Sequence, residues 1–165
     1  MAASITANLS ALDPADASYF AQRHAAFVST ALGGYHQLID TISSTYAGVA
    51  VGASESIFAP LAAALRLNLR TPATFLKAIS EGTDPSPADK TTIDHQISSD
   101  AVKVYVYNSQ NSTPDVAAQV AACRARGIPV VAVTETLSPA GATFQQWQVA
   151  QLTALLGALR RAAVR

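Results

Sequence analysis

The sequence predicts an α/β fold: a three-layer α/β/α lobe with a mostly parallel sheet, preceded by a long helix. After Gly48, short apolar runs alternate with helix-like segments, which is typical of parallel strands joined by helices on both faces of a sheet. Before Gly48, apolar residues recur at the 3.6-residue period of a helix. We therefore divide the chain into residues 1–47, a helical segment, and residues 48–165, the α/β lobe.

The N-terminal segment is predicted to contain two helices. Residues 2–12 are helix-like, and Asp13 followed by proline is typical of a new helix start, with the aspartate as N-cap. An apolar stripe with helical period then predicts one long helix over residues 13–46. Within it, the pair Gly33-Gly34 is a point at which such a helix bends.

The second segment is predicted to contain three parallel strands and the helices that connect them. The strands are expected at residues 49–53, 102–107 and 129–134. The helices are expected at residues 57–67, 73–81, 88–98, 114–126 and from residue 144 onwards, the first capped by Ser54 and the last by Thr143. The last helix is expected to face Phe144, Trp147, Leu152, Leu155 and Leu159 inward and to end in Arg160, Arg161 and Arg165.

Composition excludes several classes of protein. The chain has 11 basic and 11 acidic residues and is 50% apolar, which is typical of a compact domain and does not favour a nucleic-acid partner. No apolar run is long enough to cross a bilayer, and the N-terminal sequence shows no secretory signal. The single cysteine, Cys123, predicts neither an internal disulfide nor a cysteine-based zinc site, and we expect it to be buried.

Two of the three glutamates follow predicted strands. Glu55 comes after the first strand and Glu135 after the third, while Asn108 ends the second. Parallel strands end at the same edge of a sheet, where open α/β folds bind their ligands. Three oxygen-bearing side chains at this edge favour a hard or borderline cation. Each glutamate could instead simply stabilise the first turn of the following helix, so both interpretations stay open.

A small α/β hydrolase is the alternative from another class. Residues 52–56 nearly match the G-x-S-x-G pattern, with Ser54 as nucleophile, and Asp84 or Asp89 and then His95 follow in the order that hydrolases use. The last glycine is absent, however, and His95 lies within a predicted helix. Neither a dinucleotide fingerprint nor a P-loop occurs, so no organic cofactor is predicted, and the histidines lack metal-ligand spacing.

The residues around the two glutamates resemble a known family. Residues 54–58 resemble the S-E-x-x-F segment of the cluster A-I substrate-binding proteins of ABC transporters, the zinc and manganese group. Residues 131–137 resemble the segment that carries the last metal ligand of that family. Residues 81–87, 106–110 and 144–147 are similar to one bacterial branch of it, and the resemblance covers about residues 2–162.

This resemblance implies a function. Members have two α/β lobes joined by a long helix and bind the metal between the lobes, with two histidines from the N-terminal lobe. Glu55 then corresponds to the third ligand and Glu135 to the fourth, which is usually an aspartate and one methylene shorter. The implied function is binding of Zn²⁺ or Mn²⁺ as transported ligand and delivery to an ABC permease, without catalysis. The implied location of the parent protein is periplasmic, or extracellular and membrane-anchored.

One departure from the family qualifies this expectation. The chain begins after the segment that carries the second histidine, so we expect a C-terminal lobe with its interlobe helix, and the N-terminal lobe is missing. Two carboxylates alone predict weak metal binding with poor selectivity. The interlobe face would be open to a second copy, so a homodimer is an expected partner state, and a non-functional truncated remnant is a further alternative. The roles of Asn108 and Gln110 are left open.

Overall fold

The structure, a computed structural model, describes residues 1–164, and the chain forms two compact units, Met1–Gln37 and Leu38–Arg165. The boundary lies within helix α3 (Gly33–Thr45). The division predicted from the sequence, into residues 1–47 and 48–165, separates a helical segment from an α/β lobe. It stays a prediction. Among the described residues, no helix has the length and apolarity needed to cross a membrane.

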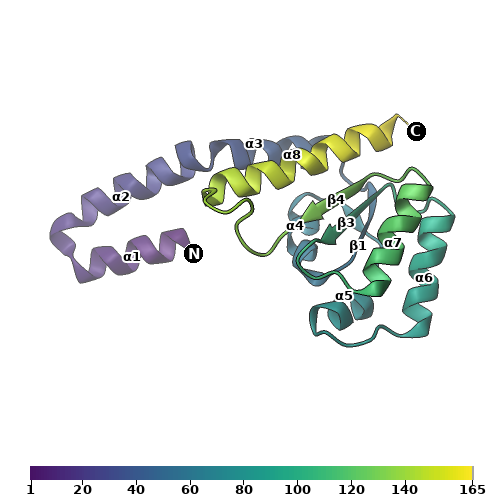
Figure 1. Ribbon diagram of the computed structural model, residues 1–165. Helices are drawn as coiled ribbons and strands as arrows, with labels where there is room; N and C mark the ends of the chain where they lie inside the picture. The colour runs from purple at the N-terminus through teal and green to yellow at the C-terminus, as the bar shows by residue number, and fades with distance from the viewer. Residues whose placement is uncertain (165) are drawn as a thin grey trace. The chain divides into compact units, whose positions relative to one another are not determined.

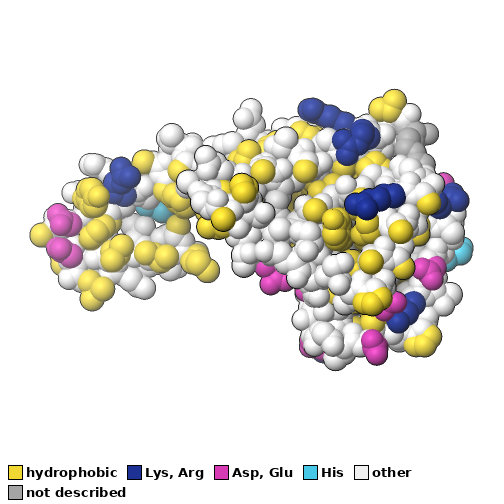
Figure 2. Space-filling view, in the orientation of Figure 1, with side chains coloured by type: hydrophobic (Ala, Val, Ile, Leu, Met, Phe, Trp, Pro, Cys, Tyr) yellow, Lys and Arg dark blue, Asp and Glu magenta, His cyan; other side chains and the backbone are white. Residues whose placement is uncertain are grey.

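The first unit consists of helical segments with little buried surface. Helix α1 (Ala2–Leu12) packs against α2 (Ala17–Ala26), and neither helix contains a buried residue. Figure 2 shows apolar side chains gathered over this unit. The large ones that are exposed are Met1, Ile5, Leu9, Leu12, Tyr19 and Val28.

The long helix expected over residues 13–46 is divided. It starts with a 3-10 turn, η1 (Pro14–Asp16), with Asp13 as its N-cap residue and proline directly after it, as predicted, although the Asp13 side chain makes no capping hydrogen bond. After α2 comes a π-helical turn, η2 (Phe27–Ala31), closed by a 2.9 Å bond from the Leu32 N–H to the Phe27 carbonyl. Regular α-helix resumes only at α3, so the irregularity lies directly before the expected glycine pair.

The second unit contains a four-stranded sheet in which every pairing is parallel. Its strands are β1 (Ala50–Ala53), β2 (Asn68–Leu69), β3 (Val104–Asn108) and β4 (Val130–Val133), in the order β2-β1-β3-β4. Strand β3 is therefore flanked by β1 and β4 (Figure 1). The predicted α/β class with a parallel sheet is confirmed.

Strand β2 is missed by the sequence patterns. A helix was expected over residues 57–67, but a 3-10 turn, η3 (Ser56–Phe58), leads into α4, which covers only Ala59–Ala64. Arg66 then takes a φ of 56°, in the left-handed region, which turns the chain out of the helix. The two residues of β2 pair with the start of β1, through Ala50 with Asn68 and Val51 with Leu69.

Helices cover both faces of the sheet. The remaining helices are α5 (Ala73–Ser80), α6 (Pro87–Ser98), α7 (Pro114–Ala125) and α8 (Phe144–Ala163). Helix α7 contacts β3 and β4, with α6 beside it, while α8 covers the other face of the same strands (Figure 1). Thr143 caps α8 in a capping box as expected, but Phe144 is 47% exposed, so its predicted inward position is wrong. Arg165 lies outside the described residues.

One core lies between the sheet and α5 to α7. Tyr105 of β3 is fully buried there, and its hydroxyl donates to Gln119 Oε1. Gly52 of β1 is required beside this ring, because a Cβ at that position would lie 2.8 Å from Tyr105 Cδ2. Cys123 is buried in the same cluster, as predicted, and burial raises the pKa of its thiol to about 12.

Candidate metal centre

The topology brings three polar side chains to one edge of the sheet. Glu55 lies two residues after β1, Asn108 is the last residue of β3, and Glu135 lies two residues after β4. The three strands run in parallel with β3 in the middle, so Asn108 lies between the two glutamates.

The Asn108 carboxamide joins the two carboxylates. Its Nδ2 atom lies 2.7 Å from Glu55 Oε2 and 2.8 Å from Glu135 Oε1, which are normal lengths for charge-assisted hydrogen bonds. One NH₂ group therefore donates to both glutamates.

The orientation of this carboxamide is set by its own hydrogen bonds. Asn108 Oδ1 accepts from the backbone N–H of Gln110 at 2.9 Å. Because a backbone N–H can only donate, the atom facing it must be the oxygen, and the nitrogen must face the carboxylates. The oxygen of Asn108 is thus engaged in a turn, so the third oxygen donor expected from the sequence is not offered by this side chain.

Glu55 is the buried member of the pair. It is 4% exposed, and its second oxygen, Oε1, accepts from Asn111 Nδ2 at 3.1 Å. Asn111 Nδ2 is itself anchored by the Ile79 carbonyl at 3.2 Å. Both oxygens of this carboxylate are therefore held by neutral amides.

Glu135 is exposed, and it is held mainly through its backbone. Gln110 Oε1 accepts from the backbone N–H groups of Glu135 at 2.8 Å and of Thr136 at 3.1 Å. On the other side, Trp147 Nε1 donates to Thr134 Oγ1 at 2.8 Å. The turn after β4 is therefore fixed on both sides, while the carboxylate itself reaches the surface.

No ion pair of the described residues 1–164 neutralises these two carboxylates. The ion pairs that the structure contains there join Lys77 to Glu81, Lys90 to Asp115 and Arg126 to Asp100. A carboxylate removed from water is costly unless it is paired or binds a metal ion. This cost applies to Glu55, whose oxygens accept from neutral amides, and not to the exposed Glu135.

The ligand set is incomplete for a tight transition-metal site. Within residues 1–164, no group of three or more His, Cys, Asp or Glu side chains is placed to hold a metal ion. Zinc sites usually have four ligands that include nitrogen or sulfur. The two glutamates together offer only carboxylate oxygens. His24 is half-buried in the first unit, and His36 is exposed.

Ser54 and Asn111 have roles that the sequence patterns do not predict. Ser54 does not cap the following helix; it is fully buried, and its Oγ accepts from the Asn108 backbone N–H at 3.1 Å. Asn111 lies in the polar loop after β3, and the nearness of that loop to the glutamates was the only available signal. The structure thus adds two residues to the three expected at this edge.

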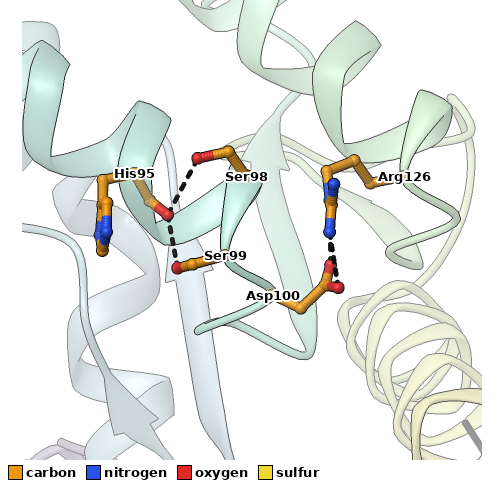
Figure 3. A network of polar contacts seen from close by, with 5 residues as sticks. All are labelled: His95, Ser98, Ser99, Asp100 and Arg126. Carbon is orange, nitrogen blue, oxygen red and sulfur yellow. Dashed lines mark hydrogen bonds and ion pairs between the residues drawn. The ribbon is translucent and has the colours of Figure 1, made fainter.

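The geometry does not favour the hydrolase alternative. The Ser54 hydroxyl is buried and engaged with Asn108, so a substrate cannot reach it. His95 is exposed on α6, and its backbone carbonyl accepts from the Ser98 and Ser99 hydroxyls beside the Asp100–Arg126 pair (Figure 3). No hydrogen bond joins Ser54 to His95 among those of the described residues.

Solved structures share this fold. The chain is similar to the Cd-bound periplasmic metal-binding protein of Candidatus Liberibacter asiaticus, with a TM-score of 0.69 and 16% identity over 96% of this chain and 58% of that chain. For FpvC of P. aeruginosa in complex with Ni²⁺, the TM-score is 0.67 and the identity 18%, over 96% and 57%. For the laminin-binding protein Lbp of Streptococcus pyogenes, the values are 0.66 and 19%, over 94% and 57%. The chain thus spans less than three fifths of the length of these relatives.

No curated protein matches the chain. A family model does: the one described as "ZnuA: Zinc-uptake complex component A periplasmic" matches residues 1–158. This match covers nearly the whole chain and confirms the resemblance drawn from the residues around Glu55 and Glu135. The chain therefore belongs to the family of zinc-uptake complex component A.

Proposed function

We propose that this chain supplies one lobe of a solute-binding protein for the uptake of a divalent transition metal. In this lobe, Glu55 and Glu135 are the two metal ligands, and the cargo is Zn²⁺ or Mn²⁺. The observation that carries the proposal is the carboxylate pair itself, which shares one neutral amide donor and has no cationic partner among residues 1–164. An ABC permease is the expected recipient of the metal.

Electrostatics supports a cation at this position. Two unit negative charges roughly 5 Å apart repel by about 3 kcal/mol at an effective dielectric constant of about 20. The Asn108 amide offsets part of this repulsion but carries no net charge. A divalent cation bound to both carboxylates converts the repulsion into attraction, so the pair gains more from a metal than from any neutral ligand.

The ligand chemistry limits how well this chain binds its cargo alone. Carboxylate oxygens suit Mn²⁺, whereas Zn²⁺ gains most from additional nitrogen ligands. The family resemblance implies that two histidines of another lobe complete the set. For the present chain we expect a dissociation constant on the order of 0.1–1 mM, by analogy with the weakest calcium-binding modules, whose ligands are also oxygens.

Relatives support the class of cargo and the location. The similar solved structures include a Cd-bound periplasmic protein and a Ni²⁺ complex, so the same fold takes divalent metals there. We accordingly place the parent protein in the periplasm, or outside the cell on a membrane anchor. We expect no enzymatic activity, because the site offers ligands for a cargo rather than an accessible nucleophile.

Calorimetric titration of the chain with Zn²⁺ and with Mn²⁺ tests the proposal. The variants are Glu55→Gln/Glu135→Gln, which removes both charges with little change of shape, and the control Glu81→Gln. Glu81 is the remaining glutamate, pairs with Lys77 and is exposed. We expect the control to bind like the wild type and the double variant to lose the binding heat. Identical heats for the wild type and the double variant would reject the site.

A further inference from the structure

We infer that Asn108 is a positioning residue for the cation: its carboxamide sets the spacing of the Glu55 and Glu135 carboxylates in the metal-free protein. This inference rests on the proposed function of the two glutamates and assigns a role to a residue that is not itself a ligand. It follows from the geometry of the amide, its anchoring and its lack of charge.

The NH₂ group of Asn108 sets the distance between its two acceptors. An amide NH₂ group is planar, and its two N–H bonds diverge at a fixed angle, so two acceptors on one such group are held at a defined separation. The two acceptors here are Glu55 Oε2 at 2.7 Å and Glu135 Oε1 at 2.8 Å. Without this group, the like charges would turn the exposed Glu135 side chain away from Glu55. The amide therefore opposes the repulsion that would open the site.

Asn108 is buried and anchored by hydrogen bonds on two sides. Its side chain is 1% exposed, its backbone N–H donates to Ser54 Oγ at 3.1 Å, and its Oδ1 accepts from Gln110 N at 2.9 Å. Rotation of the side chain would break the bond between Oδ1 and the Gln110 N–H and would withdraw the donor from both carboxylates, which is unfavourable. The amide is thus a fixed reference against which the two carboxylates are aligned.

The rest of the loop after β3 holds the turns that carry the two glutamates. Asn111 holds the second oxygen of Glu55, while Gln110 holds the backbone of Glu135 and Thr136. The segment 108–111 therefore contacts the turns on both of its sides, and only Asn108 contacts both carboxylates. This makes Asn108 the residue whose loss should separate the pair.

The Asn108 carboxamide carries no net charge. A lysine or arginine between the glutamates would hold them together but would also neutralise them and remove their attraction for a cation. An amide leaves both negative charges in place. Each carboxylate oxygen also has a further lone pair, so a metal ion can bind while the hydrogen bonds to Asn108 persist.

Titration with Mn²⁺ followed by electron paramagnetic resonance tests this role. The variant is Asn108→Leu, which has a similar size and no donor, with Asn108→Ser as a smaller second variant in case the first does not fold. The control is Ser109→Ala, whose hydroxyl donates only to the Val133 carbonyl at 3.3 Å. We expect at least tenfold weaker Mn²⁺ binding for the Asn108 variants, which is the usual effect of removing a residue that hydrogen-bonds a metal ligand. For the control we expect less than a twofold change. The spectrum of the remaining bound Mn²⁺ should also change, because the ligand geometry changes.

The outcomes separate this inference from the proposed function. A wild-type chain that binds no Mn²⁺ contradicts the proposed function, and with it the role of Asn108 toward a cation. A wild-type chain that binds Mn²⁺, together with a folded Asn108→Leu variant of the same affinity and spectrum, contradicts the positioning role alone. In the metal-free protein, a double-mutant cycle of Asn108→Leu with Glu135→Gln should give a non-zero coupling in unfolding, and additive effects would also contradict it.

Discussion

The turn after β1 and the turn after β4 contribute one carboxylate each, but they hold it in different ways. Glu55 is 4% exposed and both of its oxygens accept hydrogen bonds, whereas Glu135 is exposed and is held largely by its backbone. The first carboxylate is therefore part of the folded interior, and the second can adjust to what binds. Two glutamates in the same position after a strand can therefore differ in how much their removal destabilises the protein.

The largest effect on stability is expected where the structure is tightest. Gly52→Ala would place a Cβ 2.8 Å from Tyr105 Cδ2, beneath the turn after β1. Overpacking of this kind lowers the free energy of unfolding by about 1–3 kcal/mol. Urea unfolding measures it, with Gly33→Ala as control, since nothing lies within 4 Å of a Cβ at that position. Equal stabilities of the two variants would contradict the described packing.

Removal of each carboxylate in turn measures how much Glu55 and Glu135 stabilise the folded protein. Glu55→Ala removes the charged acceptor that the Asn108 and Asn111 amides share, so we expect the metal-free protein to lose about 1–3 kcal/mol. Each amide keeps one other acceptor, which is Glu135 for Asn108 and the Ile79 carbonyl for Asn111. Glu135→Ala removes an exposed side chain, and the change should stay within about 0.5 kcal/mol. Denaturant unfolding in the presence of a chelator distinguishes the two. A larger loss for Glu135→Ala would show that Glu135, and not Glu55, is the carboxylate that stabilises the folded protein.

Metal should stabilise the protein through both turns at once. At a Zn²⁺ or Mn²⁺ concentration of about ten times the dissociation constant, the free energy of unfolding should rise by about 1.4 kcal/mol. Either Glu55→Gln or Glu135→Gln should abolish most of this rise, because both carboxylates bind the same ion. Thermal unfolding with and without metal, reversed by a chelator, is the measurement. A rise that survives in one of the two variants would show that its glutamate is not a ligand.

The smallest effect is expected from the support of Glu55 alone. Asn111→Ala removes one of the two donors to that carboxylate and leaves Asn108 in place. We expect Mn²⁺ affinity to fall by roughly two- to fivefold. This loss is smaller than for the Asn108 variants, because Asn111 contacts one carboxylate and Asn108 contacts both. Titration beside Ser112→Ala, a substitution in the same loop, provides the control. A loss larger than that of Asn108→Leu would move the positioning role from Asn108 to Asn111.

Much of this edge could be predicted from the sequence, because it depends on local patterns. The valine-rich runs that precede Glu55 and Glu135 indicate strands, and parallel strands must end at the same edge. The proximity of the two glutamates follows from that topology without any knowledge of side-chain contacts.

The remainder depends on interactions that no local pattern encodes. The orientation of the Asn108 carboxamide is decided by the backbone N–H of Gln110, and the Asn108 backbone is held by Ser54, the residue that follows β1. Strand β2 is only two residues long and exists because it pairs with β1 after the left-handed turn at Arg66. Helical period alone could not locate the π-helical turn before α3, because a single i→i+5 turn shifts the apolar spacing by only about one residue.

Anomalous diffraction from crystals soaked in Zn²⁺ shows whether Glu55 and Glu135 bind one cation together. We expect a single strong peak at this edge of the sheet, roughly 2.0–2.2 Å from an oxygen of each carboxylate. A peak that contacts only one of the two glutamates, or zinc bound elsewhere with this edge empty, would show that the two glutamates do not form one metal site.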